Sequence, residues 1–298
     1  MSLPRILLTG KNGQVGFELQ RALAPLGEVV AVGSADCDLA DASAVRELVQ
    51  RVRPQIIVNP AAYTAVDQAE SERDQARAIN AMAPGVLGEE AARLGATVVH
   101  YSTDYVYDGN KDGRYIESDP TGPRSVYGQT KLDGERALQA ATPNHVIFRT
   151  SWVVGAHGSN FAKTMLRLAA EREELQVVAD QFGAPTSAAL IADVTAHVAR
   201  QLLRDGSAGF PFGTYHLAAD GETSWHAYAR FVIGEAIRSG QSLKVTPERV
   251  HPIPTTAFPT PAVRPPNSRL DTTHLRQSFG LHLPHWQHGV RHILQQIL

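Results

Sequence analysis

The sequence has a single cysteine, Cys37, among 298 residues. One cysteine cannot form a disulfide bond within the chain or supply the several thiolates of a cysteine-based zinc site. No run approaches the roughly 18 consecutive apolar residues that a membrane-spanning helix needs. Neither charge predominates, because 28 lysines and arginines stand against 30 acidic residues, giving a formal net charge of −2. These absences exclude a disulfide-stapled scaffold and a membrane span, and they argue against binding of nucleic acid through its phosphates.

What is present is the composition of a soluble globular protein, with 43% hydrophobic and 19% charged residues. The length allows one large domain or two unequal ones. The N-terminal segment lacks the pattern of a signal peptide, and we therefore expect a cytoplasmic protein. The expected partner is a small molecule or another protein, and neither nucleic acid nor a membrane.

The first half of the chain alternates short apolar runs with longer helical patterns. The apolar runs are continuous and rich in β-branched residues, which is typical of parallel strands buried on both faces. Strand, helix and strand in repetition indicate an α/β fold with a doubly wound parallel sheet and right-handed crossovers. The expected strands are 6–8, 29–32, 56–58, 98–99 and 146–148, and the expected helices are 14–26, 42–52, 73–92 and 127–141.

The second half keeps the helical patterns, but its strand signals are short and scattered. Six prolines between Pro252 and Pro266 exclude a central strand or helix there and predict an extended path or lid over the surface. We expect a first domain over 1–152 and a smaller α/β cap over 153–298, from which later segments can return to the first domain. The expected elements are helices 161–172, 190–203, 224–238 and 286–298 and strands 177–178, 215–217 and 250–253.

Three glycines follow the first expected strand in a G-x-x-G-x-x-G pattern, at Gly10, Gly13 and Gly16. A strand-to-helix turn without Cβ atoms lets backbone N–H groups and the helix N-terminus approach a pyrophosphate. A turn that merely packs helix against strand is the alternative, but the position of the motif favours a dinucleotide site. No Gly-Lys-Ser/Thr follows, so the motif is not that of a phosphoryl-transfer loop.

The second expected strand ends without the acidic residue that takes the ribose 2′-hydroxyl of NAD. Gly33 and Ser34 stand there, and Asp36 and Asp38 come slightly later. No arginine marks a 2′-phosphate pocket either. The sequence therefore leaves the choice between NADH and NADPH open.

Tyr127 and Lys131 lie four residues apart at the start of an expected helix, which places them on one face. An ammonium beside a phenol favours the phenolate, so we expect a lowered pKa for Tyr127 and proton exchange with an alcohol or ketone. Hydroxyl side chains after the fourth and fifth strands would lie at the same edge of the sheet. Two surface residues of a helix are the simpler alternative, which the upstream glycine turn makes the weaker one.

The glycine turn together with Tyr-x-x-x-Lys resembles the extended short-chain dehydrogenase/reductase superfamily. Within it, motifs along nearly the whole chain resemble the dTDP-4-dehydrorhamnose reductase family, in the cap as well as in the first half. These motifs occupy residues 10–16, 65–70, 100–107, 126–131, 148–153, 160–165, 181–186 and 264–268.

The resemblance implies a Rossmann-type fold and reduction of the C4 ketone of dTDP-4-dehydro-L-rhamnose to dTDP-L-rhamnose, with NADPH or NADH as hydride donor. It implies that Tyr127 donates the proton, that Lys131 holds the nicotinamide ribose and tunes Tyr127, and that Thr103, beside Ser102, is the catalytic hydroxyl. The cofactor-binding residues would be Gly10, Gly13, Gln14, Val15, Gly16, Asp38, Leu39, Ala62, Tyr63, Thr64, Tyr127 and Lys131. The sugar nucleotide would contact Thr103, Asp104 and Trp152.

Two charged features admit further interpretations. Arg264, before Pro265 and Pro266, is suited to a substrate diphosphate, since a guanidinium binds phosphate in a bidentate manner; simple surface charge is equally open. Acidic residues between Asp67 and Asp74 are expected to stabilise a helix start, where the helix dipole favours negative charge.

Some members of the resembled family bind Mg²⁺ between subunits through acidic residues. Glu18 is kept here, but the segment 186–190 has alanine where those members place glutamate, and Gln295 and Gln296 stand in the last helix. Because Mg²⁺ prefers carboxylate oxygens, these residues do not support a metal site, although Mg²⁺ is not excluded. We expect a monomer or a weak homodimer.

Other functions remain open on the same motifs. A sugar-nucleotide epimerase would use the same turn and Tyr/Lys pair. A dehydratase is disfavoured, because Thr103 is followed by Asp104 and Tyr105 and not by an Asp-Glu pair. A non-catalytic relative serves as a regulatory subunit of methionine adenosyltransferase, but the intact Tyr127 and Lys131 favour an enzyme.

Overall fold

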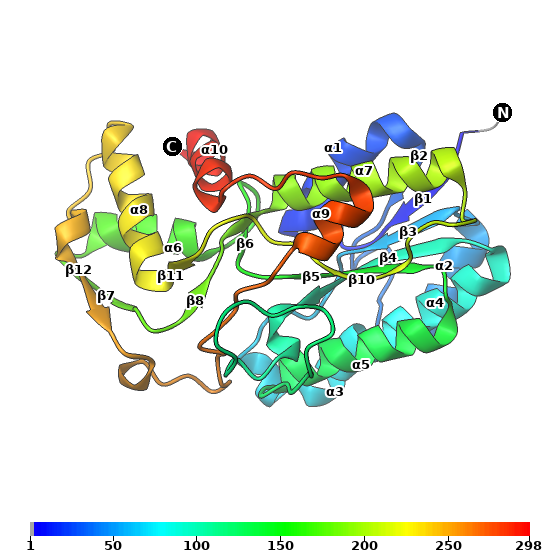
Figure 1. Ribbon diagram of the computed structural model, residues 1–298, viewed down its shortest axis with the longest axis horizontal. Coiled ribbons are helices and arrows are strands. Elements are labelled where there is room, and N and C mark those ends of the chain that lie inside the picture. Colours follow the sequence, from blue (N-terminus) through cyan, green and yellow to red (C-terminus); the bar gives the residue numbers. More distant parts are fainter. Residues whose placement is uncertain (1–2) are drawn as a thin grey trace.

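The computed structural model describes residues 3–298 and shows a six-stranded, fully parallel sheet with a smaller α/β lobe beside it (Figure 1). The strand order is β10-β5-β4-β3-β1-β2. This arrangement confirms the predicted fold class, a Rossmann-type α/β fold. The strands of the sheet are β1 (Arg5–Leu8), β2 (Glu28–Ala31), β3 (Ile56–Asn59), β4 (Thr97–Thr103), β5 (His145–Thr150) and β10 (Gly213–His216).

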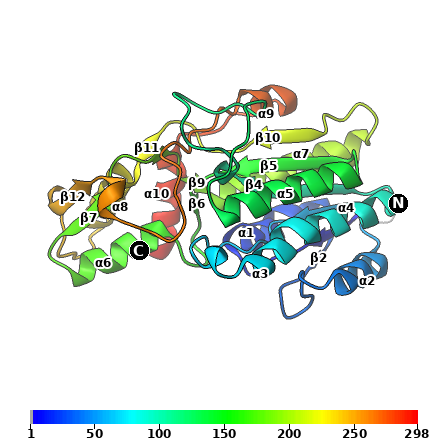
Figure 2. The ribbon, with the colours of Figure 1, turned by 90° about the horizontal axis from the view of Figure 1, so that it is seen from below.

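Helices cover both faces of this sheet, as the two ribbon views show (Figures 1 and 2). One face packs against α1 and α7, and the other against α2, α4 and α5. The helices around the sheet are α1 (Gln14–Leu23), α2 (Ala42–Val52), α3 (Arg73–Arg77), α4 (Ala83–Leu94), α5 (Val126–Ala141), α7 (Ala188–Asp205) and α9 (Thr273–Phe279).

Side-chain alternation along the strands explains why both faces are covered. Ile6 and Leu8 point into the core under α1 and α7, while Leu7 between them points into the core under α2 and α4. All three are fully buried. A strand that buries every side chain needs a continuous apolar run, and this is the pattern from which the strands were predicted.

The smaller lobe, which we call the cap, consists of three helices and paired strands that are mostly very short. Its core gathers aromatic and aliphatic side chains around Tyr228 and Trp286. A parallel pair, β7 with β12, and the two-residue strands β6, β8, β9 and β11 complete it. The cap elements are β6 (Val153–Val154), α6 (Phe161–Glu171), β7 (Leu175–Val178), β8 (Phe182–Gly183), β9 (Thr186–Ser187), β11 (Thr223–Ser224), α8 (Trp225–Arg238), β12 (Val250–Ile253) and α10 (Trp286–Ile297).

Segments after residue 152 return to the sheet. Helix α7 lies along α1, β10 pairs with β5 in parallel, and α9 packs beside β10. The chain then passes back to the cap and ends there in α10. The boundary at residue 152 stays a prediction, because the two cores are built from interleaved stretches of chain.

The expected helix 73–92 is interrupted in the structure. Between α3 and α4, residues Ala78–Met82 form a π-helical stretch, in which the N–H of Ala83 donates to the carbonyl of Ala78. Pro84 follows at the start of α4 and has no N–H to continue the α-helical ladder. Such π segments often occur at functional sites, and this one lies beside the cavity described below.

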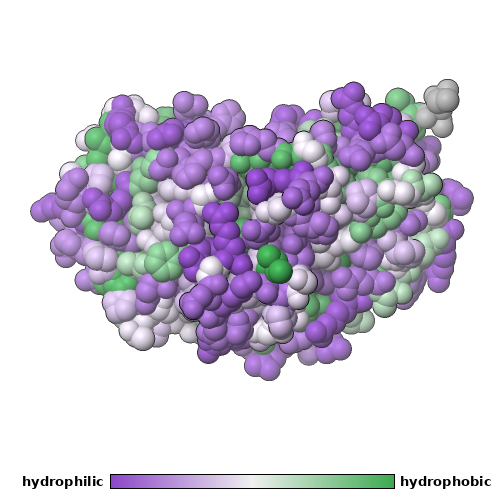
Figure 3. All heavy atoms as spheres, viewed as in Figure 1, coloured by the Kyte–Doolittle hydropathy of each residue, from purple (hydrophilic) through white to green (hydrophobic). Residues whose placement is uncertain are grey.

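The proline-rich segment is extended, as its composition predicted. Pro252 lies within β12, where the two-stranded pairing with β7 leaves an edge that does not need its N–H. Between Pro252 and Ser268, the one helical element is a short 3-10 turn, Thr255–Ala257. The face shown in Figure 3 is largely hydrophilic with scattered apolar residues. Within residues 3–298, no helix combines the length and apolarity required to cross a bilayer.

Candidate active site

A cavity of about 510 Å³ opens at the carboxyl ends of the central strands. Its floor is the glycine turn after β1, and its walls come from the ends of β2, β3 and β4 and from α5. Of the predicted cofactor residues, all but Tyr63 line it: Gly10, Gly13, Gln14, Val15, Gly16, Asp38, Leu39, Ala62, Thr64, Tyr127 and Lys131. The sheet topology therefore brings together residues as far apart in the sequence as Gly10 and Lys131, as expected for strands that end at one edge.

The glycine turn has the geometry of an anion cradle. Gly10 has φ +60°, and a Cβ there would lie 2.9 Å from the backbone of Ala61. A Cβ on Gly16 would collide with the carbonyl of Gly10. Gly13 precedes α1 without a side-chain cap, so the first N–H groups of the helix face the cavity without a protein acceptor. The residues present fit a pyrophosphate at this helix N-terminus.

Tyr63 is directed away from the cavity. Its hydroxyl donates to Glu72 Oε2 at 2.6 Å, and its backbone N–H donates to Asn80 Oδ1 at 2.8 Å. Ala62 and Thr64 on either side line the cavity instead. Asn80 also binds the backbone N–H and C=O of Tyr63, so the structure does not bring Tyr63 to the cavity.

Asn80, which the sequence analysis did not single out, holds this loop in place. Its buried amide bonds both the N–H and the C=O of Tyr63 and lies 3.2 Å from Thr130 Oγ1 on α5. Gly134 lets α5 approach, because a Cβ there would collide with the carbonyl of Asn80. Asn80 sits in the π-helical stretch, and an irregular turn leaves no periodic signal in a sequence.

Lys131 is 2% exposed and reaches the cavity from inside the protein. Its Nζ donates to the carbonyl of Tyr101 at 2.6 Å and lies 3.4 Å from His100 Nε2. Burial lowers the pKa of Lys131 to about 8. The ammonium is thus fixed by a backbone carbonyl and keeps donor hydrogens for a ligand in the cavity.

Three further buried side chains, His100, Asn59 and Thr9, form a row of contacts behind Lys131. Asn59 lies 3.1 Å from His100 Nδ1, and Thr9 Oγ1 donates to Asn59 Oδ1 at 2.6 Å. Burial and the neighbouring ammonium keep the pKa of His100 well below its usual value, so the ring is neutral. Both ring nitrogens of His100 face a nitrogen donor, Asn59 Nδ2 at Nδ1 and Lys131 Nζ at Nε2. Asn59 and His100 lie within β3 and β4 and Thr9 directly follows β1, and the sequence pattern assigned none of the three a role.

Tyr127 stands across the cavity edge with its ring packed edge-on against Tyr105. Burial raises the pKa of Tyr127, and a hydrogen bond with Thr103 opposes that rise. The prediction that Lys131 lowers the pKa of Tyr127 is wrong, because the Lys131 ammonium donates to the Tyr101 carbonyl instead. Tyr127 therefore stays protonated at neutral pH.

Polar groups at the end of β4 lie beside Tyr127. Thr103 Oγ1 donates to Asp104 Oδ1 at 3.1 Å, and Ser102 lines the cavity with a buried hydroxyl that has no partner. Asp104 is 3% exposed, and its Oδ2 also lacks a partner. Burial raises the pKa of Asp104 to about 6. Unpartnered buried polar atoms at one place indicate a site completed by a ligand.

Trp152 has a left-handed backbone, with φ +49°, and stacks on Trp225 with ring centroids 3.6 Å apart. A Cβ on Gly183 would lie 2.7 Å from the Trp152 ring, so this glycine is needed for the ring position. The indole thus stands at the entrance to the cap, next to the end of β5. Such strain is typical of functional positions.

Arg264 pairs with Asp67, with 2.7 Å between Nη2 and Oδ2. Its Nη1 is buried without a partner. Asp67 also accepts from the N–H of Ala262, and its side chain does not cap a helix. The helix-capping interpretation is therefore wrong for Asp67, which instead holds the proline-rich segment. Glu70 accepts from the N–H of Val126 at the start of α5.

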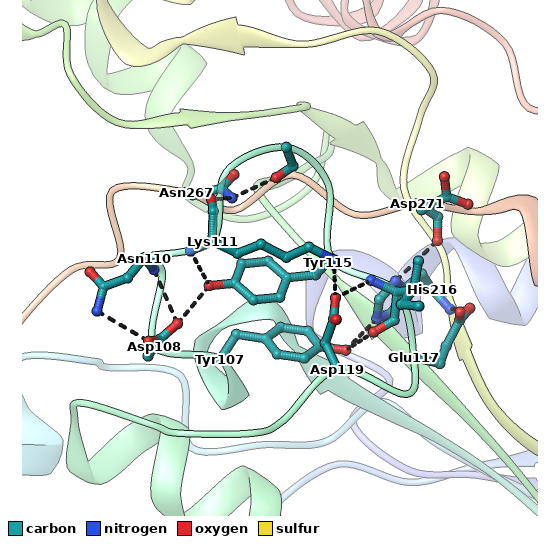
Figure 4. Close-up of polar contacts among 12 residues, drawn as sticks. Tyr107, Asp108, Asn110, Lys111, Tyr115, Glu117, Asp119, His216, Asn267 and Asp271 are labelled. Carbon is teal, nitrogen blue, oxygen red and sulfur yellow. Dashed lines mark hydrogen bonds and ion pairs between the residues drawn. The ribbon is translucent and has the colours of Figure 1, made fainter.

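The loop between β4 and α5 is held by the network in Figure 4. Tyr115 stacks on Tyr107 with ring centroids 4.2 Å apart and donates to Asp108 at 2.7 Å. The Tyr107 hydroxyl lies 2.7 Å from His216 Nε2 on β10. Asn267, just after the proline-rich segment, donates to the carbonyls of Lys111 and Gly113. This bridge connects the cap to the loop that follows Asp104.

No group of three or more His, Cys, Asp or Glu side chains within residues 3–298 is arranged to hold a metal ion. Glu18 lies beside Arg21, whose Nε donates to its carboxylate at 3.3 Å. The surface hollow next to it is lined by Ala189 and Gln296 as well as by histidines. The expectation of no metal-bridged dimer stays a prediction.

Comparison with known proteins gives long matches. The chain matches the family model described as the RmlD substrate binding domain over residues 4–298. The dTDP-4-dehydrorhamnose reductase of Shigella flexneri is 53% identical over 98% of this chain and 97% of that protein. The reductase of the same name from Burkholderia thailandensis is 47% identical over 99% of both. The solved dTDP-4-dehydrorhamnose reductase of Bacillus anthracis, in complex with NADP, is 36% identical, with 99% of this chain and 100% of that chain covered and a TM-score of 0.88.

These matches include the cap as well as the glycine turn, so they exceed a likeness of fold. They confirm the resemblance that the motifs indicated. The chain belongs to the dTDP-4-dehydrorhamnose reductase family of NAD(P)-dependent oxidoreductases.

Proposed function

We propose that this chain reduces the C4 ketone of dTDP-4-dehydro-L-rhamnose to dTDP-L-rhamnose, with NADPH or NADH as the reductant. The observation that carries the proposal is the single cavity that joins the glycine turn to Lys131 and Tyr127. The names of relatives up to 53% identical over almost the whole chain supply the substrate class.

The glycine cradle and the buried ammonium fit a dinucleotide. The free N–H groups of Gln14 and Val15, with Gly13, would bind the pyrophosphate, and Lys131 would bind the nicotinamide ribose. When bound, the nicotinamide supplies the hydride that reduces C4. Residues 1–152 would supply most of this cofactor site, and 153–298 most of the cap over the substrate.

Tyr127 is the proposed proton donor. Its raised pKa keeps the phenol protonated at neutral pH, so that it gives its proton to the C4 oxygen as negative charge develops there. The Thr103 hydroxyl, at the end of β4 beside Tyr127, would help to orient the same oxygen. The resulting phenolate then regains a proton from solvent.

The cap side would hold the sugar nucleotide. Trp152 presents an apolar indole beside the sugar, and the unpartnered Asp104 Oδ2 can accept from a sugar hydroxyl. The unpartnered Nη1 of Arg264 suits a diphosphate oxygen, with Asp67 holding the other edge of the guanidinium. Asp104 and Arg264 would each gain in the complex a hydrogen bond that they lack here.

The test mixes the purified chain with dTDP-4-dehydro-L-rhamnose and either reduced nicotinamide. Oxidation of the cofactor with equimolar formation of dTDP-L-rhamnose, identified by NMR, is the expected result. An isomerised sugar formed without net cofactor oxidation would instead show an epimerase. Cofactor binding without any conversion would show a non-catalytic binding module.

A further inference from the structure

The adenosine end of the cavity has an unusual charge arrangement. Gly33 follows β2 at the place where NAD-binding folds carry an acidic residue for the ribose 2′-hydroxyl. A Cβ on Gly33 would lie 3.6 Å from Cε of Lys11 and 3.0 Å from Nδ2 of Asn12. The side chains of the glycine turn therefore lie over the position that an acidic residue would otherwise fill.

The Lys11 ammonium is held there by one carboxylate. Its Nζ lies 2.7 Å from Asp36 Oδ2, and the same oxygen accepts from the N–H of Gly33 at 2.8 Å. The two side chains are 31% and 43% exposed, so both can change rotamer without unpacking the core. The hydrogen bond from Lys11 lowers the pKa of Asp36, which keeps this carboxylate charged at neutral pH.

Lys11 contacts Gly33 at this end of the site, with 3.6 Å between its Cε and a Cβ placed on Gly33. Among the described residues that line the cavity, Lys131 is the one lysine and there is no arginine, and Lys131 lies at the opposite, nicotinamide end. Gly33, Ser34, Asp38 and Leu39 line the adenosine end. A 2′-phosphate bound beside Gly33 would lie near the Lys11 ammonium and near the carboxylates of Asp36 and Asp38.

We propose that Lys11 and Asp36 together set the preference between NADPH and NADH, with Lys11 binding the 2′-phosphate and Asp36 competing for Lys11. The proposal rests on the dinucleotide site of the proposed function. With NADH, the ion pair stays intact beside a neutral 2′-hydroxyl. With NADPH, Lys11 exchanges the carboxylate for the phosphate, and Asp36 repels the bound phosphate. These opposed effects predict a small preference for one cofactor in the unmodified chain and shifts of opposite direction when Lys11 or Asp36 is replaced.

Two single variants test the pair, Lys11→Met and Asp36→Asn. Methionine keeps the length of the side chain without its charge, and asparagine keeps an oxygen that accepts from the Gly33 N–H. Dissociation constants for NADPH and NADH are measured by fluorescence titration. Displacement by adenosine 2′,5′-bisphosphate and by ADP isolates the 2′-phosphate from the nicotinamide.

Opposite shifts are the expected result. Lys11→Met should weaken NADPH and adenosine 2′,5′-bisphosphate about tenfold while NADH and ADP change by less than about twofold, because one charge-assisted contact is lost. Asp36→Asn should tighten NADPH about threefold by releasing Lys11 and removing the repulsion. The matched control is the exposed cap pair Lys244 and Glu173, in which Lys244→Met and Glu173→Gln should leave both constants unchanged.

Equal effects of Lys11→Met on NADPH and NADH, or an Asp36→Asn change that disfavours NADPH, would overturn the proposal. The binding readout separates this outcome from the reaction. If the chain binds both cofactors with the expected shifts but reduces no 4-keto sugar, the proposed function fails and the assignment of the pair stands. If the chain reduces the sugar but neither variant changes the ratio of the NADPH and NADH dissociation constants, the proposed function stands and the assignment of the pair fails.

Discussion

The sheet and the cap are held together by different means. In the sheet, parallel backbone ladders such as the six-residue register between β4 and β5 fix the strand ends, and buried apolar side chains close both faces. In the cap, several ladders are two residues long, and the packing depends on helices and on stacked rings such as Trp152 and Trp225.

This difference runs parallel to the two proposed roles, chemistry with cofactor binding on one side and sugar-nucleotide binding on the other. Of the groups proposed for proton transfer and cofactor binding, the glycine turn follows β1, and Tyr127 and Lys131 stand on α5, which packs against β4. Of the groups proposed for the sugar nucleotide, Trp152 and Arg264 stand where side chains hold the backbone, whereas Asp104 directly follows β4. We therefore expect changes at the sheet to alter turnover or stability, and changes at the cap to alter substrate affinity.

The largest expected effect is from Tyr127→Phe. Removing the phenolic proton should lower kcat by about 10²- to 10⁴-fold while the dissociation constant of the cofactor stays unchanged. Steady-state kinetics and a cofactor titration check this. Tyr105→Phe, which removes a hydroxyl from the neighbouring ring, is the control and should cost far less. Near-normal turnover in Tyr127→Phe would remove this residue from the chemistry.

A second large effect concerns stability on the sheet side. Arg149 on β5 donates to Glu135 on α5, with 2.6 Å between Nη2 and Oε2, and both side chains are buried. Arg149→Leu leaves a buried carboxylate unpaired and should lower the free energy of unfolding by about 3–5 kcal/mol in urea titration. Adding Glu135→Leu should recover much of the loss. A double variant no more stable than the single one would contradict this reason.

Lys131 predicts a pH dependence of cofactor binding. Its pKa of about 8 means that the ammonium is present below this pH and is lost above it. Affinity for NADH should therefore be highest below about pH 8 and fall up to about tenfold per pH unit above it. Titrations across this range check the step. The Lys131→Met variant should bind NADH more weakly, and its affinity should not fall above pH 8. If the fall persists in the variant, another group causes it.

The smallest expected effect lies in the cap. Asn267→Ala removes the two hydrogen bonds to the carbonyls of Lys111 and Gly113. With the bridge lost, KM for the sugar nucleotide should rise a few-fold, about 1 kcal/mol, with cofactor affinity unchanged. Asn110→Ala, an exposed change in the same loop, is the control. If cofactor affinity changed by the same factor, the expectation that cap changes act on substrate affinity alone would be wrong.

Sequence periodicity predicted the elements that are long and regular. Helix α2 begins and ends where expected, because Asp41 caps it and its apolar face repeats cleanly. The two-residue strands of the cap and the short helix α9 were missed, since so few residues carry no period. Tyr127 and Lys131 were placed in one cavity from the motif alone. Asn80 was not found, because its position depends on a π turn.

The alternation of the chain between sheet and cap has a consequence for evolution and engineering. A fragment cut after residue 152 lacks α7, α9 and β10, and with them much of one covered face and one edge strand of the sheet. A lobe of this kind cannot be exchanged between relatives by recombination at one point. A change confined to the lobe therefore requires substitutions within it or exchange at several points along the chain.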